Sequence, residues 1–229
     1  MKLSVIIPSY NEAATLLQCL DSVYGKNPGR DMEVILVDDG SSDATPAIAK
    51  TIRQPGFKYL RHQTNAGKGS AVRTGIAAAT GEAIIIQDAD LEYDPAEYGR
   101  IVRPIEEGRA AVVYGSRILN KANGKSNWLF YLGGRLVSWW TNALYGSHIT
   151  DEPTCYKAFR SDILKSLELK ARRFEFCAEV TAKILRRKIA IMEIPISYNP
   201  RSVNAGKKIR YSDGLQTLWW LLKLRFSKT

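Results

Sequence analysis

The chain has 229 residues, of which 45% are hydrophobic and 24% charged, so it is long enough for one substantial core and too apolar for a disordered protein. Its formal net charge of +10 is unevenly placed, because residues 157–229 carry 17 Lys and Arg against 6 Asp and Glu. This basic excess favours an anionic partner, which is a nucleic acid, an anionic membrane surface or a phosphorylated acceptor.

Short apolar strands alternate with helices through the first half of the chain. Strands are expected at residues 3–7, 33–37, 57–60, 83–86 and 110–114, and helices at 12–24, 43–53, 67–79 and 95–107. Asp43 is the expected cap of the second helix. This alternation is typical of an α/β fold with a mostly parallel sheet and helices on both faces.

After Gly115 the pattern changes. Residues 127–146 are rich in aromatic side chains, strands are expected at 155–159 and 189–196, and a helix at 175–187 lies between them. A polar, basic loop at 199–208 and a helix at 213–226 end the chain. No linker or repeat divides the sequence, so we expect one domain at residues 1–210 followed by an apolar and basic C-terminal helix at 211–229.

Polar residues follow three of the expected strands. Pro8 to Glu12 follow the first strand, Asp38 and Asp39 the second, and Asp88-Ala89-Asp90 the fourth. Each group taken alone fits a turn and a helix cap. Because ligands of parallel sheets bind at the carboxyl ends of the strands, their convergence favours a binding site. Paired carboxylates there suit Mg²⁺ or Mn²⁺, which would hold a substrate diphosphate.

The strings PSYNE, VDDGSSD, NAGKGSAVRTG and QDADLEYDP, in this order, resemble the family-2 inverting glycosyltransferases with the Rossmann-like GT-A fold. The strings GSR, DEPTCYKAFR and FEFCAEV extend the resemblance to polyprenyl- or dolichyl-phosphate mannosyl- and glucosyltransferases, and the likeness covers residues 2–210. It implies transfer of a hexose from GDP-mannose or UDP-glucose to an acceptor, above all a polyprenyl or dolichyl phosphate. A hydroxyl acceptor on a saccharide or lipid is the alternative.

The resemblance also assigns roles to individual residues. The nucleotide-sugar would contact Pro8, Tyr10, Glu12, Val37, Asp39, Lys68, Asp88, Ala89 and Asp90. The metal ion, Mg²⁺ or Mn²⁺, would be held by Asp88, Asp90 and Glu92. Asp151, Asp90 and Arg117 are the expected catalytic residues.

The acceptor determines which further residues the reaction needs. An acceptor phosphate would be bound by Arg117, Arg135, Arg201 and Lys207, since guanidinium groups bind phosphate through two hydrogen bonds. A hydroxyl acceptor needs a general base, for which Asp151 stands at the matching position, although it is equally a turn residue before Pro153. A phosphate acceptor is already anionic and needs no base, and the sequence leaves both possibilities open.

Two segments bear on membrane attachment. In residues 135–145, Arg135, Ser138 and Asn142 lie opposite an apolar face of Leu136, Trp139, Trp140, Ala143 and Leu144. In the C-terminal helix, an apolar stripe of Leu215, Leu218, Trp219, Leu222 and Phe226 is widened by Trp220, Leu221 and Leu224. Such a helix is either packed on the sheet or lies in a membrane interface. We expect peripheral association with the cytosolic face of a membrane.

Two further features of the sequence indicate the compartment in which the protein works. Cys19, Cys155 and Cys177 are far apart and odd in number, which favours a reducing cytosolic compartment over a disulfide framework or a zinc site. The N-terminal apolar run is too short for a signal peptide, and no window reaches the ~20 apolar residues of a membrane span.

Competing functions explain less of the sequence. A nucleic-acid-binding protein would account for the basic excess but not for the acidic strand ends, and no such partner is expected. A P-loop is excluded, because His62 stands where its first Gly belongs and Gly69 follows Lys68. A metal-dependent sugar nucleotidyltransferase is the nearer rival. The donor base, the sugar and the oligomeric state are not determined by these motifs.

Overall fold

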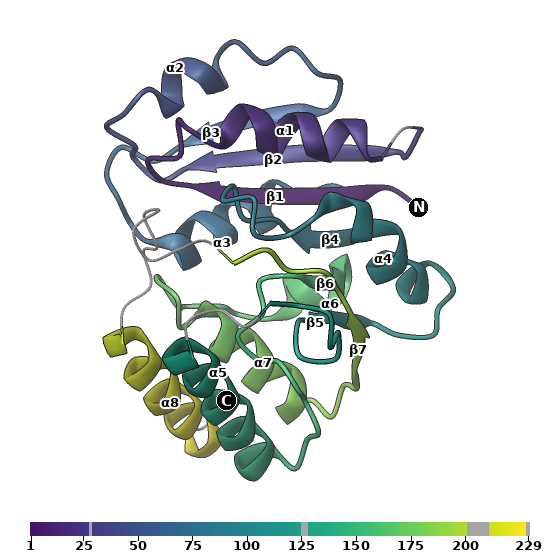
Figure 1. Ribbon diagram of the computed structural model, residues 1–229, viewed down its shortest axis with the longest axis vertical. Coiled ribbons are helices and arrows are strands. Elements are labelled where there is room, and N and C mark those ends of the chain that lie inside the picture. The colour runs from purple at the N-terminus through teal and green to yellow at the C-terminus, as the bar shows by residue number, and fades with distance from the viewer. Residues whose placement is uncertain (28, 125–127, 201–210, 228–229) are drawn as a thin grey trace.

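The computed structural model describes residues 1–27, 29–124, 128–200 and 211–227, which form a seven-stranded sheet flanked by helices (Figure 1). The strands are β1 (Leu3–Ser9), β2 (Met32–Asp38), β3 (Phe57–Arg61), β4 (Ala83–Ile86), β5 (Val112–Ser116), β6 (Lys157–Arg160) and β7 (Ile191–Pro195). They lie in the order β3-β2-β1-β4-β6-β5-β7. The expected α/β fold with a mostly parallel sheet is confirmed.

One strand departs from the expected parallel pattern. β6 pairs antiparallel with both of its neighbours, β4 and β5, whereas β1–β2, β1–β4, β2–β3 and β5–β7 pair in parallel. The chain leaves β5 through the long helix α5 (Trp128–Tyr145) and re-enters the sheet where β5 ends, with Lys157 opposite Tyr114. The loop before β6 is therefore at the edge of the sheet where the parallel strands end.

The core is formed by the apolar strands and the helices packed on them. Every residue of β1 and β4 is buried, as expected for strands covered on both faces. Helix α3 (Lys68–Ala78) packs on β1 and β2 and approaches closely at Gly75, where an added Cβ would lie 2.4 Å from Ile6 Cγ2. A larger residue at this position would push the helix away from the sheet.

The remaining helices of the first half follow the expected order with shifted ends. They are α1 (Leu16–Gly25), α2 (Thr45–Ala49) and α4 (Tyr98–Glu106), the last preceded by the short 3₁₀ helix η1 (Pro95–Glu97). Helix α2 is shorter than predicted and its N-cap is Ala44, although Asp43 Oδ1 still accepts the N–H of Thr45 at 2.9 Å. Helix α6 (Ser161–Ser166) was not predicted, because it is short and lacks a periodic pattern.

Three helices form a layer beside the second half of the sheet, namely α5, α7 (Phe176–Arg186) and α8 (Tyr211–Phe226) (Figure 1). Helix α8 packs mainly against α5 and α7, with Leu221 and Leu224 buried. The hydroxyl of Tyr145 on α5 donates to the carbonyl of Leu221 at 2.7 Å. Among the helices of the described residues, none has the length and apolar character needed to cross a membrane.

Candidate functional site

A pocket of about 1330 Å³ lies where β1, β2 and β4 end and extends to α5 and α8. It brings together most residues that the sequence assigns to a site: Pro8, Tyr10, Glu12, Asp39, Lys68, Asp88, Ala89, Asp90, Glu92, Arg117 and Asp151. The strand directions explain this, because parallel strands deliver their following loops to one edge of the sheet.

Other assigned residues do not line this pocket. Val37 is fully buried in β2 between β1 and β3, so its side chain belongs to the core. Arg135 is exposed on α5, where its Nη1 donates to the carbonyl of Thr150 at 3.3 Å. Arg201 and Lys207 are outside the described residues.

At the first end of the pocket, Asp39 organises the loop that leads into α3. Its carboxylate accepts the N–H groups of Ala66 at 2.9 Å and Gly67 at 2.7 Å and contacts Nδ1 of His62 at 2.7 Å. Gly67 has φ +96°, and an added Cβ would lie 2.3 Å from the carbonyl oxygen of Arg172, so only glycine fits. Asp39 thus fixes the start of α3 while lining the pocket.

The carboxylates after β4 create a negatively charged middle region. Asp88 Oδ1 lies 2.6 Å from Nζ of Lys68, and Asp90 Oδ1 accepts the N–H of Glu92 at 3.1 Å. Burial, followed by the negative charges of Asp90, Asp88 and Glu12, raises the pKa of the nearby Cys19 thiol to about 12. The carboxylates of Asp88, Asp90 and Glu12 line one pocket, and their charges attract cations to it.

The carboxylate oxygens in this region fit a hard divalent cation whose remaining ligands come from a bound substrate. Within the described part of the chain, no group of three His, Cys, Asp or Glu side chains is arranged to hold a metal ion. Mg²⁺ sites in phosphate-binding enzymes commonly use one or two protein carboxylates, and substrate phosphates complete the shell. Asp88 and Asp90 match that pattern, and Glu92, the third expected ligand, lines the same pocket. Lys68 would stand beside the diphosphate.

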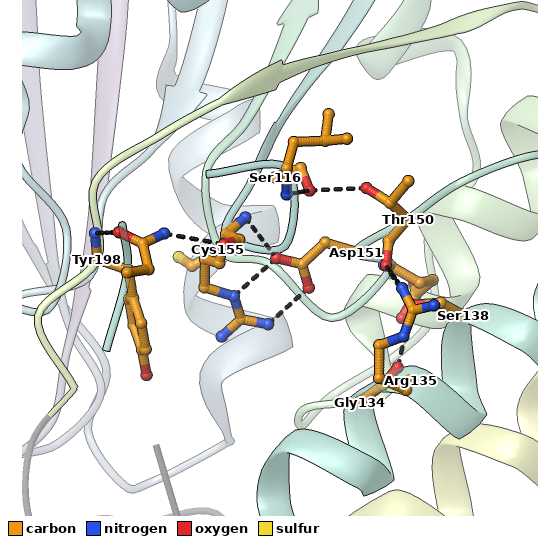
Figure 2. A network of polar contacts seen from close by, with 12 residues as sticks. Ser116, Gly134, Arg135, Ser138, Thr150, Asp151, Cys155 and Tyr198 are labelled. Atoms are coloured by element: carbon orange, nitrogen blue, oxygen red, sulfur yellow. Dashed lines mark hydrogen bonds and ion pairs between the residues drawn. The ribbon is translucent and has the colours of Figure 1, made fainter. Parts of the chain in front are cut away.

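Arg117 and Asp151 form a closed ion pair further along the pocket (Figure 2). Asp151 Oδ2 accepts the backbone N–H and Nε of Arg117, both at 2.8 Å, and Oδ1 accepts Nη2 at 2.7 Å. Burial alone would raise the pKa of Asp151, but the charge and hydrogen bonds of Arg117 outweigh it and hold that pKa below the usual value. Asp151 is therefore ionised, with both oxygens occupied.

The segment carrying Asp151 is itself held by a residue that sequence reasoning missed. Glu193 of β7 accepts the N–H of Thr150 at 2.8 Å and the N–H of Asp151 at 3.1 Å. The hydroxyls of Ser116 and Thr150 are 2.7 Å apart, so the end of β5 is tied to the same segment (Figure 2). Unlike the acidic motifs, Glu193 lies in the middle of its strand, so no local pattern marked it.

The far end of the pocket is apolar and is formed by α5 and α8. Helix α5 has its polar side turned inward: Ser138 is 3% exposed, and its Oγ accepts the N–H of Glu152, while Asn142 donates to the carbonyl of Ile149. Exposed apolar residues cover its outer side and continue on α8. They are Trp128, Leu132, Leu136, Trp139, Leu215, Trp219 and Phe226, which we call the α5/α8 surface.

This arrangement refines the expectation for both helices. Ser138 and Asn142 do lie opposite Leu136 and Trp139, and these two polar residues face the protein while Leu136 and Trp139 are exposed. Trp140 and Leu144 of the expected apolar face pack against α7 and α8, whereas Arg135 is exposed. On α8 the predicted stripe faces outward at Leu215, Trp219 and Phe226, which are 71%, 61% and 76% exposed. The residues expected to widen that stripe make the packing contacts instead.

Comparison with known proteins gives consistent likenesses. The family model described as Glycosyl transferase family 2 matches residues 4–168. UDP-N-acetylglucosamine–dolichyl-phosphate N-acetylglucosaminyltransferase of Methanococcus voltae is 29% identical and aligns with 98% of this chain and 96% of its own length. Dolichol-phosphate mannosyltransferase of Pyrococcus furiosus is also 29% identical, over 90% of this chain, which spans 59% of that relative.

Solved structures share the fold at lower identity. Glucosyl-3-phosphoglycerate synthase from Mycobacterium tuberculosis, in complex with Mn²⁺, uridine diphosphate and phosphoglyceric acid, superposes with a TM-score of 0.77. The two chains are 20% identical, and the match covers 100% of this chain and 80% of that one. At this identity the likeness establishes the fold.

Proposed function

This chain belongs to glycosyl transferase family 2, and from that membership we propose that it moves a hexose from a nucleotide-sugar to the phosphate of a polyprenyl or dolichyl lipid. The observation that carries the proposal is that a single pocket joins a charged region to an apolar one. It begins among the carboxylates after β1, β2 and β4, passes Arg117, and continues between apolar residues of α5 and α8. A charged diphosphate suits the first part, and an amphipathic acceptor suits the second.

At the donor end, Pro8, Tyr10, Glu12 and Asp39 would contact the nucleoside. Mg²⁺ or Mn²⁺, between the Asp88-Ala89-Asp90 segment and the diphosphate, would neutralise the charge that builds on the leaving group. The solved neighbours carry uridine diphosphate with Mn²⁺ or with Mg²⁺, which supports this part. Relatives are named for both N-acetylglucosaminyl and mannosyl transfer, so GDP-mannose and UDP-linked sugars are both candidates.

At the acceptor end, the state of Asp151 favours a phosphate over a hydroxyl. A base that activates a hydroxyl must accept its proton within hydrogen-bond reach. Asp151 is 2% exposed, and its oxygens are occupied by Arg117, so it is a weak candidate for that task. A phosphate monoester is already a nucleophile near neutral pH, and the Arg117 guanidinium would attract it.

The chemistry that follows is a single displacement. An oxygen of the acceptor phosphate forms a bond to C1 of the sugar while the bond from C1 to the diphosphate breaks on the opposite face, so the anomeric centre inverts. Arg117 would orient the attacking phosphate, and Lys68 would stabilise the departing diphosphate by its charge. Burial lowers the pKa of Lys68, but the charge of Asp88 outweighs that effect and raises it well above its usual value, so the ammonium stays protonated.

We further propose that the α5/α8 surface lies in the cytosolic interface of a membrane. Its tryptophans are typical of that interface, and the basic residues Arg135, Lys223 and Arg225 are exposed on the same two helices. Cations near an anionic surface each contribute about 1 kcal/mol. Docking there would bring the apolar end of the pocket to the depth of the lipid acceptor.

The test is a panel of nucleotide-sugars offered to the purified protein with Mn²⁺ or Mg²⁺, with and without polyprenyl phosphate in detergent. We expect one nucleotide-sugar to release nucleoside diphosphate only when the lipid phosphate and a metal are present. Release that needs a soluble alcohol and ignores lipid phosphate would establish the hydroxyl alternative. Release of inorganic diphosphate from a nucleoside triphosphate and a sugar phosphate would establish a nucleotidyltransferase.

A further inference from the structure

Four tyrosine rings form a column that runs from the sheet to the pocket. The ring centroids of Tyr98 and Tyr156 are 5.9 Å apart, those of Tyr156 and Tyr93 4.7 Å, and those of Tyr93 and Tyr198 5.4 Å. At its base, the hydroxyls of Tyr98 and Tyr156 both donate to Oε1 of Gln87, at 2.7 Å and 2.6 Å. Because Tyr98, Tyr156 and Tyr93 are buried, the ring of Tyr198 packs on a rigid support.

The hydroxyl of Tyr198 contacts Glu92, the third expected metal ligand. It donates to Oε2 of Glu92 at 2.8 Å, and the backbone N–H of Asn199 donates to the carbonyl oxygen of Glu92 at 2.9 Å. Glu92 comes two residues after Asp90 and lines the same pocket. The position of the Glu92 carboxylate is thus set by a residue more than one hundred positions later, |i−j| = 106.

The ring of Tyr198 meets the acceptor end of the pocket. The guanidinium carbon of Arg117 lies 5.1 Å from the ring centroid, which is within the range of a cation–π contact. The backbone is fixed as well: Tyr198 N–H donates to Oδ1 of Asn123 at 3.0 Å, and Nδ2 of Asn123 donates to the carbonyl oxygen of Arg117 at 2.8 Å (Figure 2). Asn123 and the ring together hold Tyr198 and Arg117 as one unit.

We propose that Tyr198 is a positioning residue that joins the two halves of the site. Its hydroxyl orients Glu92 toward the cation and the donor diphosphate, and its ring orients Arg117 toward the acceptor phosphate. This inference rests on the proposed function. It adds that the two substrates meet the same rigid side chain, so one residue controls the affinity of the cation and that of the acceptor through different atoms.

Two substitutions separate these contributions. Tyr198→Phe removes the hydroxyl and keeps the ring, whereas Tyr198→Leu removes both. The first readout is the affinity of Mn²⁺ in the presence of UDP or GDP, by calorimetry or electron paramagnetic resonance, which needs no turnover. The second is the KM for polyprenyl phosphate with whichever donor the wild-type protein uses.

Tyr198→Phe should weaken Mn²⁺ binding about tenfold, as loss of a partner that orients a metal ligand commonly does, and leave the acceptor KM unchanged. Tyr198→Leu should weaken Mn²⁺ binding equally and also raise the acceptor KM about tenfold, because the cation–π contact is lost. Tyr59→Phe is the matched control, since Tyr59 donates to Oδ2 of Asp38 at 3.0 Å and does not line the pocket. It should change neither readout.

Unchanged Mn²⁺ affinity in Tyr198→Phe would overturn the inference, as would equal effects of Phe and Leu on the acceptor KM. An equal loss of Mn²⁺ affinity in Tyr59→Phe would do so too, because it would reveal a general effect of losing a phenol. Failure of the proposed function gives a different result: the wild-type protein itself would bind no Mn²⁺ with either nucleotide, and the inference would fall with it.

Discussion

Replacing Asp151 by Asn tests whether this carboxylate positions Arg117 or acts as a base. The amide has the same shape but presents one oxygen and one NH₂ group to the three N–H donors of Arg117. At least one charge-assisted hydrogen bond is lost, and the guanidinium loses its counter-charge. Since the Arg117 side chain is 22% exposed, the cost is below that of a fully buried pair, and we expect the free energy of unfolding to fall by about 2 kcal/mol.

The kinetic effect separates the two roles. If Asp151 only positions Arg117, the kcat/KM for polyprenyl phosphate should fall about tenfold, or ~1.4 kcal/mol in the barrier, mainly through the acceptor KM. Loss of a general base would cost about 10²- to 10⁴-fold in rate. Because Arg117 lowers the pKa of Asp151, the wild-type and variant profiles should run parallel between about pH 6 and about pH 8.

Steady-state kinetics in detergent, with thermal or denaturant unfolding of the same samples, measures both effects. Asp162→Asn is the control, because Asp162 forms the same two-bond pair with Arg160 on an exposed surface, at 2.6 Å and 2.8 Å. It should affect neither activity nor, measurably, stability. A loss above about a thousandfold in Asp151→Asn, with an unchanged acceptor KM and a lost titration in the rate profile, would refute the positioning role.

Other parts of the account give separate predictions. Burial alone would raise the pKa of Glu33, but hydrogen bonds from Lys58, Ser4 and Thr80 outweigh it and lower the pKa to about 2. The ionised carboxylate therefore contributes up to about 3 kcal/mol to the free energy of unfolding above about pH 4.5, and this contribution should disappear as the pH falls toward about 2. Glu33→Gln should be less stable near neutral pH and should flatten that dependence in denaturant titrations; an unchanged slope would contradict this reading. Asp90→Ala should abolish the Mn²⁺-dependent rise in melting temperature with nucleoside diphosphate, whereas an undiminished rise would move the cation elsewhere. Trp219→Gln on the outer side of α8 should weaken binding to anionic vesicles without loss of folding, and equal binding would exclude that side as the contact.

The sequence predicted which residues meet at the donor end of the pocket, because most of them follow a strand. Apolar runs locate β1, β2 and β4, and parallel strands bring Glu12, Asp39 and Asp88 to one edge whatever the details of packing. Val37 was the exception. It was assigned by likeness to a position within a strand, where its side chain is in the core.

The acceptor half depends on contacts that no local pattern encodes. The Arg117–Asp151 pair joins residues with |i−j| = 34, and the antiparallel direction of β6, which brings Asp151 to the site, has no signal in strand composition. Periodicity placed Ser138 opposite Trp139 on α5 but could not tell which residues face the protein, since Trp140 packs inward and Arg135 is exposed. Tyr198 and Glu193 escaped notice because their partners are distant in sequence.

The most direct test of the central claim is the identity of the product. The purified protein would be incubated with polyprenyl phosphate, Mn²⁺ and the nucleotide-sugar that the panel selects, and the lipid fraction analysed by mass spectrometry. The account predicts a lipid heavier by one hexose unit, joined through a single phosphate and released as free sugar by mild acid. An unmodified lipid, alongside sugar transferred to a water-soluble alcohol, would contradict it.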